Sequence, residues 1–216
     1  IDLITGFLGS GKTTFIKKYA KYLMAQGMNI GILENDFGAV NVDMMLLKDL
    51  EGDQCELEMV AGGCDADCHR RRFKTKLIAM GMCGYDRVIV EPSGIFDVDE
   101  FFDVLREEPL DQWYEIGSVI TIMNAKLEDT LSEEAEYLLA SEAANAGCVV
   151  LSRSQDASPE EIAKTRAHLN CALQAVHCSR QFGDEIIEKN WEDFTEQDLE
   201  RIQNSGYHVE DYTKLH

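Results

Sequence analysis

The stretch that most limits the fold of this 216-residue chain is Gly6–Thr13, which reads GFLGSGKT. It matches the pattern G-x-x-x-x-G-K-[ST] and lies between an apolar run at 1–5 and a helix-forming run at 12–26. That pattern needs a strand before it and a helix after it, because loop N–H groups and the positive helix end together bind phosphate. The sequence therefore predicts a phosphate-binding loop carried by an α/β sheet.

The loop also predicts roles for single residues. Lys12 is expected to reach the β and γ phosphates of a nucleotide, and the Thr13 hydroxyl to coordinate Mg²⁺. The expected nucleotide-binding residues of this segment are Gly9, Ser10, Gly11, Lys12, Thr13 and Thr14. A glycine-rich turn that carries a lysine by chance is the alternative, and the flanking strand and helix argue against it.

Short β-branched runs alternate with longer amphipathic runs along the chain. The expected strands are 1–5, 29–34, 87–91, 118–123, 148–152 and 172–178, and 55–60 is a candidate for one more. The expected helices are 12–26, 66–80, 97–107, 132–145, 159–169 and a tail helix that includes Leu199 and Ile202. This βαβ rhythm predicts a doubly wound, mostly parallel sheet in a three-layer αβα P-loop fold. We expect a single domain over residues 1–216, because no repeat or linker interrupts the pattern.

The amino-acid composition limits which partners this chain can bind and in which cellular compartment we expect it. The formal net charge is −20, so the overall field repels nucleic acid and anionic membranes. No apolar run approaches the roughly 20 residues that a membrane span needs, and no signal peptide is visible. The odd number of cysteines, 7, argues against a disulfide framework and leaves thiols for metal binding. We expect a cytoplasmic protein with no nucleic-acid or membrane partner.

Two other strand ends carry polar residues that suit a nucleotide hydrolase. RVIVE ends at Glu91, which is expected to lie beside Mg²⁺, and Gly94 is expected to present its N–H to the γ phosphate. Asp36 follows the strand at 29–34 and is placed to orient water, bind metal or respond to the γ phosphate. The alternatives are a solvent-exposed carboxylate for Glu91 and an ordinary Asx turn for Asp36.

Residues 62–72 read GGCDADCHRRR, which indicates a transition-metal site. Cys64 and Cys68 lie four positions apart, so their sulfurs share one face if a helix begins near Asp65, and His69 can add a nitrogen ligand. The set is incomplete for structural zinc, so a second subunit in a nucleotide-stabilised dimer, a nearby aspartate or a client must complete it. Buried core thiols are the alternative. The arginines 70–72 lower the thiolate pKa values, or form a solvated face or a docking patch for an acidic partner.

Four motifs in a fixed order carry a resemblance to a known family. GFLGSGKTT, ENDFG, a Gly-Cys loop and VIVEPSG resemble the CobW/HypB/UreG group of metal-insertion P-loop GTPases, most closely its CobW-like branch, over roughly residues 1–155. The resemblance implies a GTP-binding domain that hydrolyses nucleotide slowly. It also implies that this cycle is coupled to delivery of Zn²⁺, Co²⁺ or Ni²⁺ to a client metalloprotein.

The chain departs from this family at several points. CobW-like members carry Gly-Cys-x-Cys-Cys, whereas this chain has Cys64 and Cys68 with three residues between them. Guanine-specific members carry Asn-Lys-x-Asp, whereas residues 152–156 read SRSQD, so both GTP and ATP stay open. Ser152 and Arg153 are the expected base contacts there, with the arginine stacked on the purine. The C-terminal domain of many CobW-like proteins is expected to be absent, or the sequence to be a fragment.

Three function classes compete on the sequence. The leading hypothesis is an Mg²⁺-dependent NTPase that acts as a metal chaperone or metallocentre assembly factor. The alternative is an ATP-driven electron-transfer or activator protein, in which Cys64 and Cys68 of two subunits bind one iron–sulfur cluster. A small-molecule kinase would explain the phosphate loop without the cysteines.

Overall fold

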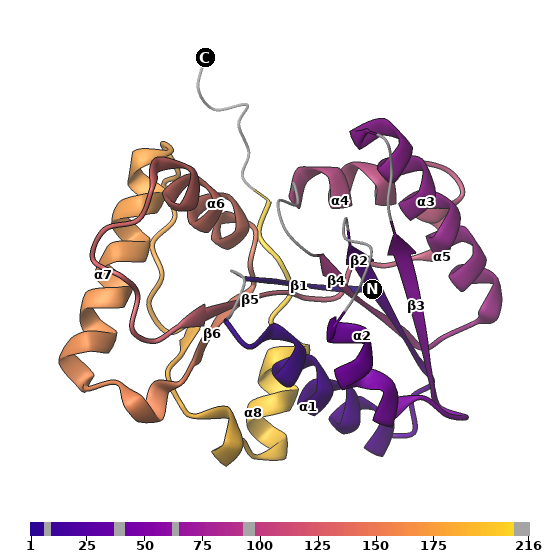
Figure 1. Cartoon of the computed structure of the whole chain (residues 1–216), viewed down its shortest axis with the longest axis horizontal. Helices are drawn as coiled ribbons and strands as arrows, with labels where there is room; N and C mark the ends of the chain where they lie inside the picture. The colour runs from indigo at the N-terminus through magenta and orange to yellow at the C-terminus, as the bar shows by residue number, and fades with distance from the viewer. Residues whose placement is uncertain (7–9, 37–41, 62–64, 93–97, 210–216) are drawn as a thin grey trace. The chain divides into compact units, whose positions relative to one another are not determined.

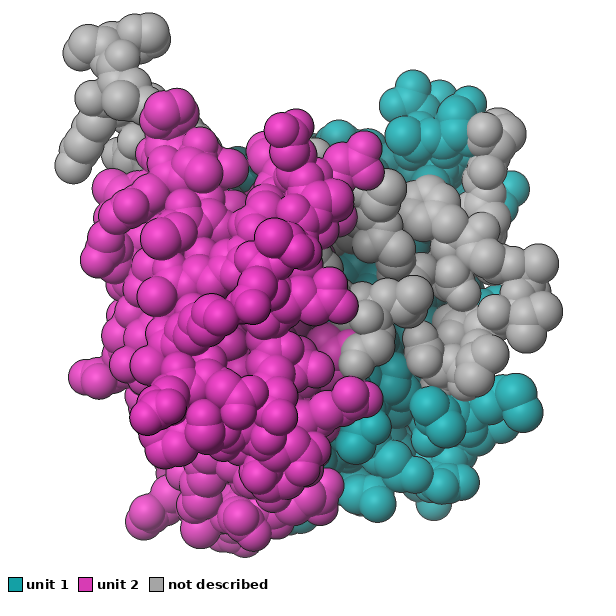
Figure 2. Space-filling model, turned by 60° about the vertical axis from the view of Figure 1, so that its left-hand side comes forward, with its two compact units in different colours: residues 1–4, 11–117 teal, residues 5–10, 118–216 magenta. Residues whose placement is uncertain are grey.

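The computed structural model describes residues 1–6, 10–36, 42–61, 65–92 and 98–209, with backbone alone at 36, 42–43 and 61. The chain divides into two compact units, residues 1–4 with 11–117 and residues 5–10 with 118–216, coloured separately in Figure 2. Each unit combines parallel strands with helices (Figure 1), which confirms the predicted α/β class. The single domain expected over residues 1–216 stays a prediction.

The first unit is built on strands in the order β3-β2-β4-β1, with β3 at the edge. The strands are β1 (Asp2–Gly6), β2 (Ile30–Asp36), β3 (Cys55–Ala61) and β4 (Arg87–Pro92). The pairs β1–β4, β2–β4 and β2–β3 are parallel. The helices are α1 (Lys12–Ala25), α2 (Val42–Leu47), η1 (Lys48–Leu50), α3 (Ala66–Cys83), α4 (Val98–Arg106) and α5 (Leu110–Trp113). Figure 1 shows α1 and α2 on one face of these strands and α3, α4 and α5 on the other.

The core of this unit contains apolar side chains that recur at helical spacing in the sequence. Helix α1 turns Phe15, Tyr19 and Leu23 inward at intervals of four residues, and all three are fully buried. The Asp2 carboxylate lies within that core and accepts hydrogen bonds from Arg87 Nε at 2.6 Å, Arg87 Nη2 at 2.9 Å and Tyr19 Oη at 2.7 Å. The donors of Arg87 and Tyr19 satisfy both oxygens of a carboxylate that has no exposed surface.

The second unit contains strands β5, β6 and β7, with the pairs β5–β6 and β6–β7 parallel. Its strands are β5 (Val119–Asn124), β6 (Cys148–Ser152) and β7 (Ile186–Ile187). Its helices are α6 (Glu133–Ala144), η2 (Ser154–Asp156), α7 (Pro159–Ala175), η3 (Trp191–Asp193) and α8 (Glu196–Gln203). A buried cluster packs α6 and α7 on β5 and β6, and it includes Met123, Leu139, Leu151 and Leu169. Within the described ranges, no helix is long and apolar enough to cross a bilayer.

One predicted strand is wrong. Residues 172–178 were expected to be extended, whereas α7 continues to Ala175. The helix begins with a capping box formed by Ser158 and Glu161, and Leu169 and Leu173 then continue its buried face four residues apart. The chain leaves the helix only near His177, whose φ of 60° is left-handed. The second strand that pairs with β6, besides β5, is β7, which has only two residues and is too short to show a strand pattern in the sequence.

The other predicted elements agree with the structure. Residues 55–60 form a strand, β3, and the tail helix is α8, which buries Leu199 and Ile202. The short helices α2 and α5 were not predicted, because 6 and 4 residues are too few to show a helical repeat.

Candidate functional site

The loop between β1 and α1 has backbone features that only glycine supplies easily. Gly11, which immediately precedes α1, has a left-handed φ of 87°. A Cβ on Gly6 would lie 2.3 Å from the carbonyl oxygen of Ile122, so this turn needs glycine for close approach. Ser10 is buried, and its Oγ has no hydrogen-bond partner among the described residues. Gly9, an expected phosphate contact, lies outside the described residues.

The first turn of α1 brings Lys12 and Thr13 to the carboxyl end of β4. Lys12 Nζ donates to the carbonyl oxygen of Pro92 at 3.2 Å, and Thr13 Oγ1 donates to Glu91 Oε1 at 3.0 Å. Thr13 and Glu91 are both buried, whereas Thr14 is exposed. The hydroxyl and carboxylate oxygens are ligands that fit Mg²⁺, and the nearby ammonium fits the oxygens of a polyphosphate.

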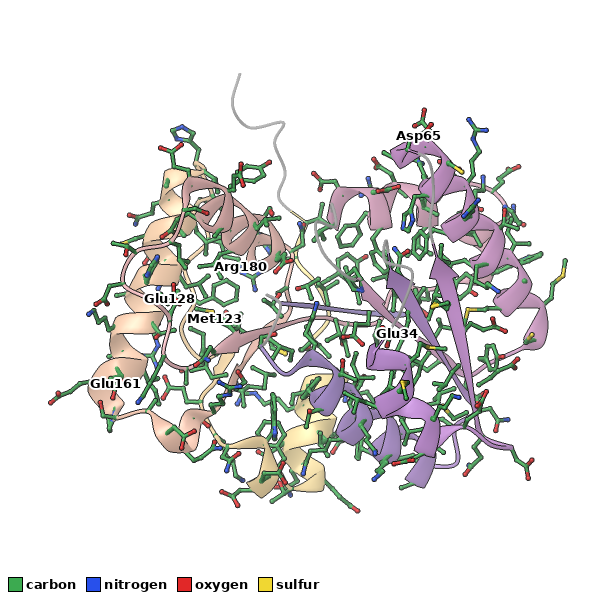
Figure 3. All side chains as sticks on the ribbon, in the orientation of Figure 1. Glu34, Asp65, Met123, Glu128, Glu161 and Arg180 are labelled. Carbon is green, nitrogen blue, oxygen red and sulfur yellow. The ribbon has the colours of Figure 1, made fainter. Side chains whose placement is uncertain are left out.

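A second carboxylate that the sequence reasoning did not single out lies beside this pair. Glu34 on β2, labelled in Figure 3, is in register with Glu91 on β4, and both residues are buried. Residues paired across parallel strands project to the same face of the sheet, so both carboxylates face the side of α1. Two buried carboxyl groups on neighbouring strands form a pair of oxygen ligands that a bound cation would satisfy. The signal was available: GILE and VIVE both end an apolar run on glutamate.

The remaining residues expected near the phosphates are described in part. Asp36 is the last residue of β2, and its side chain lies outside the described set. Gly94 lies outside the described residues altogether. Asn35, beside Asp36, is buried, and neither Oδ1 nor Nδ2 has a hydrogen-bond partner within the described part of the chain. Their expected roles stay predictions.

The segment expected to contact the base follows β6. Ser152 pairs in register with Asn124, and its Oγ donates to the Met123 carbonyl oxygen at 3.4 Å. Arg153 is exposed and has a left-handed φ of 55°. The buried Ser154 Oγ has no hydrogen-bond partner among the described residues. The end of β6 thus carries an exposed arginine and a buried hydroxyl, and its sequence has no Asn-Lys-x-Asp motif.

The cysteine segment leads into α3 as expected. Asp65 caps this helix, because its Oδ1 accepts a hydrogen bond of 2.7 Å from the N–H of Cys68 (Figure 3). Cys68 is half-buried, whereas His69 is only 1% exposed. Successive residues of a helix project about 100° apart, so these side chains occupy different faces. Cys64 lies outside the described residues.

A complete metal site is not visible in the part of the chain that is described. No group of three or more His, Cys, Asp or Glu side chains there is arranged to hold a metal ion. The site expected from Cys64, Cys68 and His69 therefore stays a prediction.

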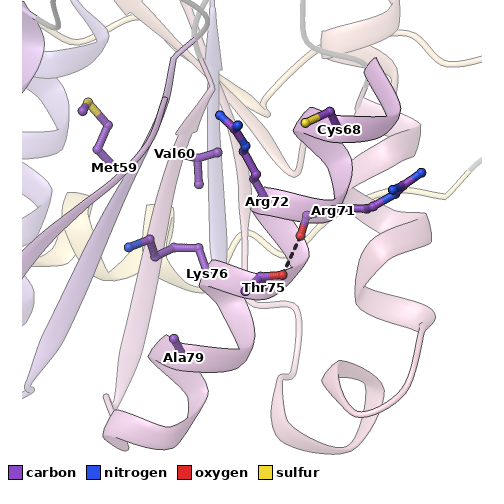
Figure 4. Close-up of a pocket in the computed structure, with 8 residues that line it drawn as sticks. All are labelled: Met59, Val60, Cys68, Arg71, Arg72, Thr75, Lys76 and Ala79. Atoms are coloured by element: carbon purple, nitrogen blue, oxygen red, sulfur yellow. Dashed lines mark hydrogen bonds between the residues drawn. The ribbon is translucent and has the colours of Figure 1, made fainter. Parts of the chain in front are cut away.

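The basic residues of α3 separate into two sets. Arg70 and Lys74 both bind Glu107, at 2.5 and 2.6 Å, and these two cations hold the pKa of Glu107 below its usual value. Arg71, Arg72 and Lys76 instead line a groove of about 430 Å³ beside Cys68 (Figure 4). This β3–α3 groove lies between Met59–Val60 of β3 and the face of α3 that runs from Cys68 to Ala79.

The other described thiols differ in accessibility. Cys55 and Cys148 are buried, and desolvation raises the pKa of each thiol to about 11. Cys178 is buried as well, while Cys83 and Cys171 are exposed. Buried, protonated thiols are poor metal ligands, so Cys55 and Cys148 are core packing residues.

Comparison with known proteins gives a family match over most of the chain. The model of the CobW/HypB/UreG nucleotide-binding domain matches residues 1–181. The chain is similar to the zinc chaperone YeiR of Escherichia coli (strain K12), with 28% identity over 163 residues, 74% of this chain and 48% of that protein. It is also similar to zinc-regulated GTPase metalloprotein activator 1 of Schizosaccharomyces pombe, with 22% identity over 198 residues, 87% of this chain and 47% of that protein. The chain thus spans about half the length of these relatives.

Solved structures support the fold. The hydrogenase maturation factor HypB from Archaeoglobus fulgidus superposes with a TM-score of 0.54 at 16% identity, over 88% of this chain and 81% of that one. At this identity, the likeness shows the fold alone.

Proposed function

The chain belongs to the CobW/HypB/UreG family of nucleotide-binding domains, and on that premise we propose that it is an Mg²⁺-dependent GTPase that delivers a transition metal to a client metalloprotein. The observation that carries the nucleotide half is the buried hydrogen bond from Thr13 to Glu91, with Lys12 one residue away. Its place at the start of α1, after a left-handed Gly11, is the arrangement that a phosphate loop needs.

The chain's own groups have separable tasks in this proposal. Lys12 binds the β and γ phosphates, and the loop N–H groups with the α1 N-terminus bind phosphate oxygens. Thr13 and Glu91 hold Mg²⁺, and buried Glu34 adds negative charge beside them. When bound, Mg²⁺ offsets the charge that develops on the phosphate oxygens. Asp36 is proposed to orient the attacking water and Gly94 to bind the γ phosphate.

Zinc is the metal proposed as cargo, because the relatives YeiR and the S. pombe activator are named for zinc. Cys64 and Cys68 are the proposed ligands, and the half-buried Cys68 suits transfer better than the buried His69. An incomplete thiolate set holds a metal while leaving coordination positions for the acceptor. The iron–sulfur alternative finds no support in the names of the relatives.

The expected client metalloprotein, the nucleotide-stabilised dimer and the cytoplasmic location are part of the same proposal. Ser152 and Arg153 are kept as proposed base contacts, with GTP as the substrate and ATP as the competitor.

One experiment tests the two halves together. The protein is purified without oxygen, loaded with GTP or ATP and Mg²⁺, and examined by native mass spectrometry, elemental analysis and phosphate release. Zinc bound per chain and release of phosphate from GTP are the expected results. A brown, iron-containing protein would favour the cluster alternative, and absence of phosphate release from either nucleotide would contradict the enzyme assignment.

A further inference from the structure

The β3–α3 groove has an open strand edge on one side. β3 pairs with β2, and the described residues supply no strand on its other side. Exposed strand edges carry unpaired backbone groups that readily accept another strand. The groove is lined by Met59 and Val60 of this edge strand, so the open edge and the groove lie at the same end of β3.

Backbone bonding at the start of β3 shows which residues point outward. The Gln54 carbonyl accepts a hydrogen bond of 2.8 Å from Ile30 N–H, so residue 54 faces β2. Cys55 instead bonds outward, in an antiparallel bridge with Gly52. Because the direction alternates along a strand, Leu57 and Met59 also point their N–H and C=O groups outward. No hydrogen bond to the N–H or C=O of Met59 occurs among the described residues.

The α3 side of the groove is basic. Cys68, Arg72, Thr75 and Ala79 follow each other at intervals of three or four residues, so they form one stripe of the helix. Figure 4 shows Arg72 and Lys76 extending from α3 toward the strand side. Lys76 binds Glu58 at 2.9 Å, and Glu56 accepts a hydrogen bond from Tyr85.

This positive charge is unusual for the chain, whose net charge is −20. Arg71, at the rim of the groove, has no ion pair among the described residues. Within a Debye length of about 10 Å at 0.1 M salt, such local charges outweigh the distant acidic surface. Glu58 offsets the charge of Lys76, but the described lining of the groove also holds Arg71 and Arg72 and no carboxylate, so the groove favours an anionic occupant.

The geometry points to a docking site for an extended acidic segment of a partner protein, which adds as a strand to the free edge of β3 with its carboxylates facing Arg72 and Lys76. Such strand addition takes affinity from backbone hydrogen bonds and specificity from alternate side chains. Carboxylates at every second position would face α3, and the apolar side chains between them would face Met59.

A partner bound in this groove would lie next to the proposed metal ligand Cys68. Cys68 lies at the same end of the groove as the start of α3, so a segment bound on β3 would end beside this thiol. This direction of transfer rests on the proposed function, in which Cys68 holds the cargo. Peptide docking is measured with neither nucleotide nor metal, so a failure of the docking site and a failure of the metal assignment are distinguishable.

The first test measures charge recognition. The probe is a dye-labelled nine-residue peptide with glutamate at alternate positions and valine between them, titrated by fluorescence anisotropy. The variant Arg71→Gln with Arg72→Gln is expected to weaken binding about tenfold or more, and added salt to weaken wild-type binding. The matched control Arg70→Gln with Lys74→Gln removes the same charge from the same helix on the Glu107 side, and it is expected to bind as wild type.

The second test measures strand addition. Met59→Pro removes one outward N–H while leaving the β2-facing groups of Glu58 and Val60 in place, and proline is tolerated on edge strands. This variant is expected to lose binding, whereas Met59→Ala retains it. If Met59→Pro fails to fold by circular dichroism, a peptide N-methylated at alternate residues replaces it, and that peptide is expected not to bind the wild-type protein.

Several results would overturn the inference. These are absence of saturable binding at millimolar peptide, equal binding of a peptide with lysine in place of glutamate, or binding unaffected by both the arginine and the strand-edge changes. Sedimentation velocity decides a further case: a dimer that Met59→Pro converts to monomer would show that a second copy of the chain occupies the edge instead.

Discussion

The hydroxyl of Thr13 donates a hydrogen bond of 3.0 Å to Oε1 of Glu91, although 78 positions separate the two residues in the chain. The contact exists because α1 begins where β4 ends, so the first helical turn meets the last residues of the strand. Glu34 occupies the neighbouring strand in register with Glu91. The start of α1 and the ends of β4 and β2 therefore each contribute one oxygen-bearing side chain to this site.

Removal of the loop lysine should abolish nucleotide binding without unfolding the protein. Lys12 donates only a 3.2 Å bond to the Pro92 carbonyl oxygen among its described contacts, so Lys12→Ala removes an ammonium that serves phosphate. Isothermal titration calorimetry with GTP measures the loss, and circular dichroism checks the fold. Lys21→Ala, an exposed lysine on the same helix, is the control and should bind as wild type. Near-wild-type affinity in Lys12→Ala would defeat the phosphate-loop assignment.

Neutralising Glu91 should separate binding from turnover. Glu91→Gln keeps an oxygen that accepts from Thr13 but removes the charge, so nucleotide should still bind while Mg²⁺ affinity falls about 10–100-fold. Phosphate release measured across a range of Mg²⁺ concentrations should show the shift, together with slower hydrolysis. Glu128→Gln makes the same charge change at an exposed position and should have no effect. An unchanged Mg²⁺ dependence in Glu91→Gln would leave Glu91 with a structural role.

Much of this site could be read from the sequence, because its signals are local. The phosphate loop is continuous in the chain, and Glu91 ends a strand in the familiar context of such folds. Glu34 was missed because the polar residues after it drew attention to Asp36. Only the register between β2 and β4 shows that Glu34 and Glu91 face the same side.

The burial of His69 was equally beyond sequence reasoning. Its position next to Cys68 suggested a shared ligand set, yet the helix places the two side chains on different faces, one half-buried and one buried. The strand predicted at 172–178 failed for a related reason. The apolar residues of this short run fit the helical period as well as the strand period. The structure forms a helix there because Leu169 and Leu173 pack into the core of the second unit.

Base selectivity should be weaker than in proteins with a complete guanine motif. In residues 152–156 the aspartate that would pair with the guanine amino group is replaced by Gln155 or displaced by one position to Asp156, and Arg153 offers stacking, which any purine accepts. We therefore expect GTP to be preferred over ATP by less than the roughly 10⁴-fold that purine-edge hydrogen bonds can reach. Competition binding with labelled GTP measures the ratio. A GTP preference of several orders of magnitude over ATP would contradict this prediction.

Thiol reactivity should follow burial. Desolvation raises the pKa of Cys55 and of Cys148 to about 11, so at pH 8 almost none of either thiol is ionised. Only the thiolate reacts, so iodoacetamide at pH 8 should label Cys83 and Cys171 and leave these two unlabelled until the pH approaches 11. Peptide mapping by mass spectrometry reads each site. Labelling of Cys55 at the rate of Cys83 would contradict its placement in the core.

Cys64 and Cys68 should bind the metal. Cys68 is half-buried at the start of α3, where Asp65 holds its N–H at 2.7 Å, so Cys68→Ser keeps the helix cap while exchanging sulfur for a much weaker zinc ligand. Cys64→Ser combined with Cys68→Ser should therefore abolish zinc binding, measured by elemental analysis after anaerobic purification, and leave GTP affinity unchanged. The control Cys83→Ser with Cys171→Ser removes two exposed thiols elsewhere and should keep the full zinc content. If the first double variant retains the zinc stoichiometry of the wild type, the cysteines at 64 and 68 are not the cargo site.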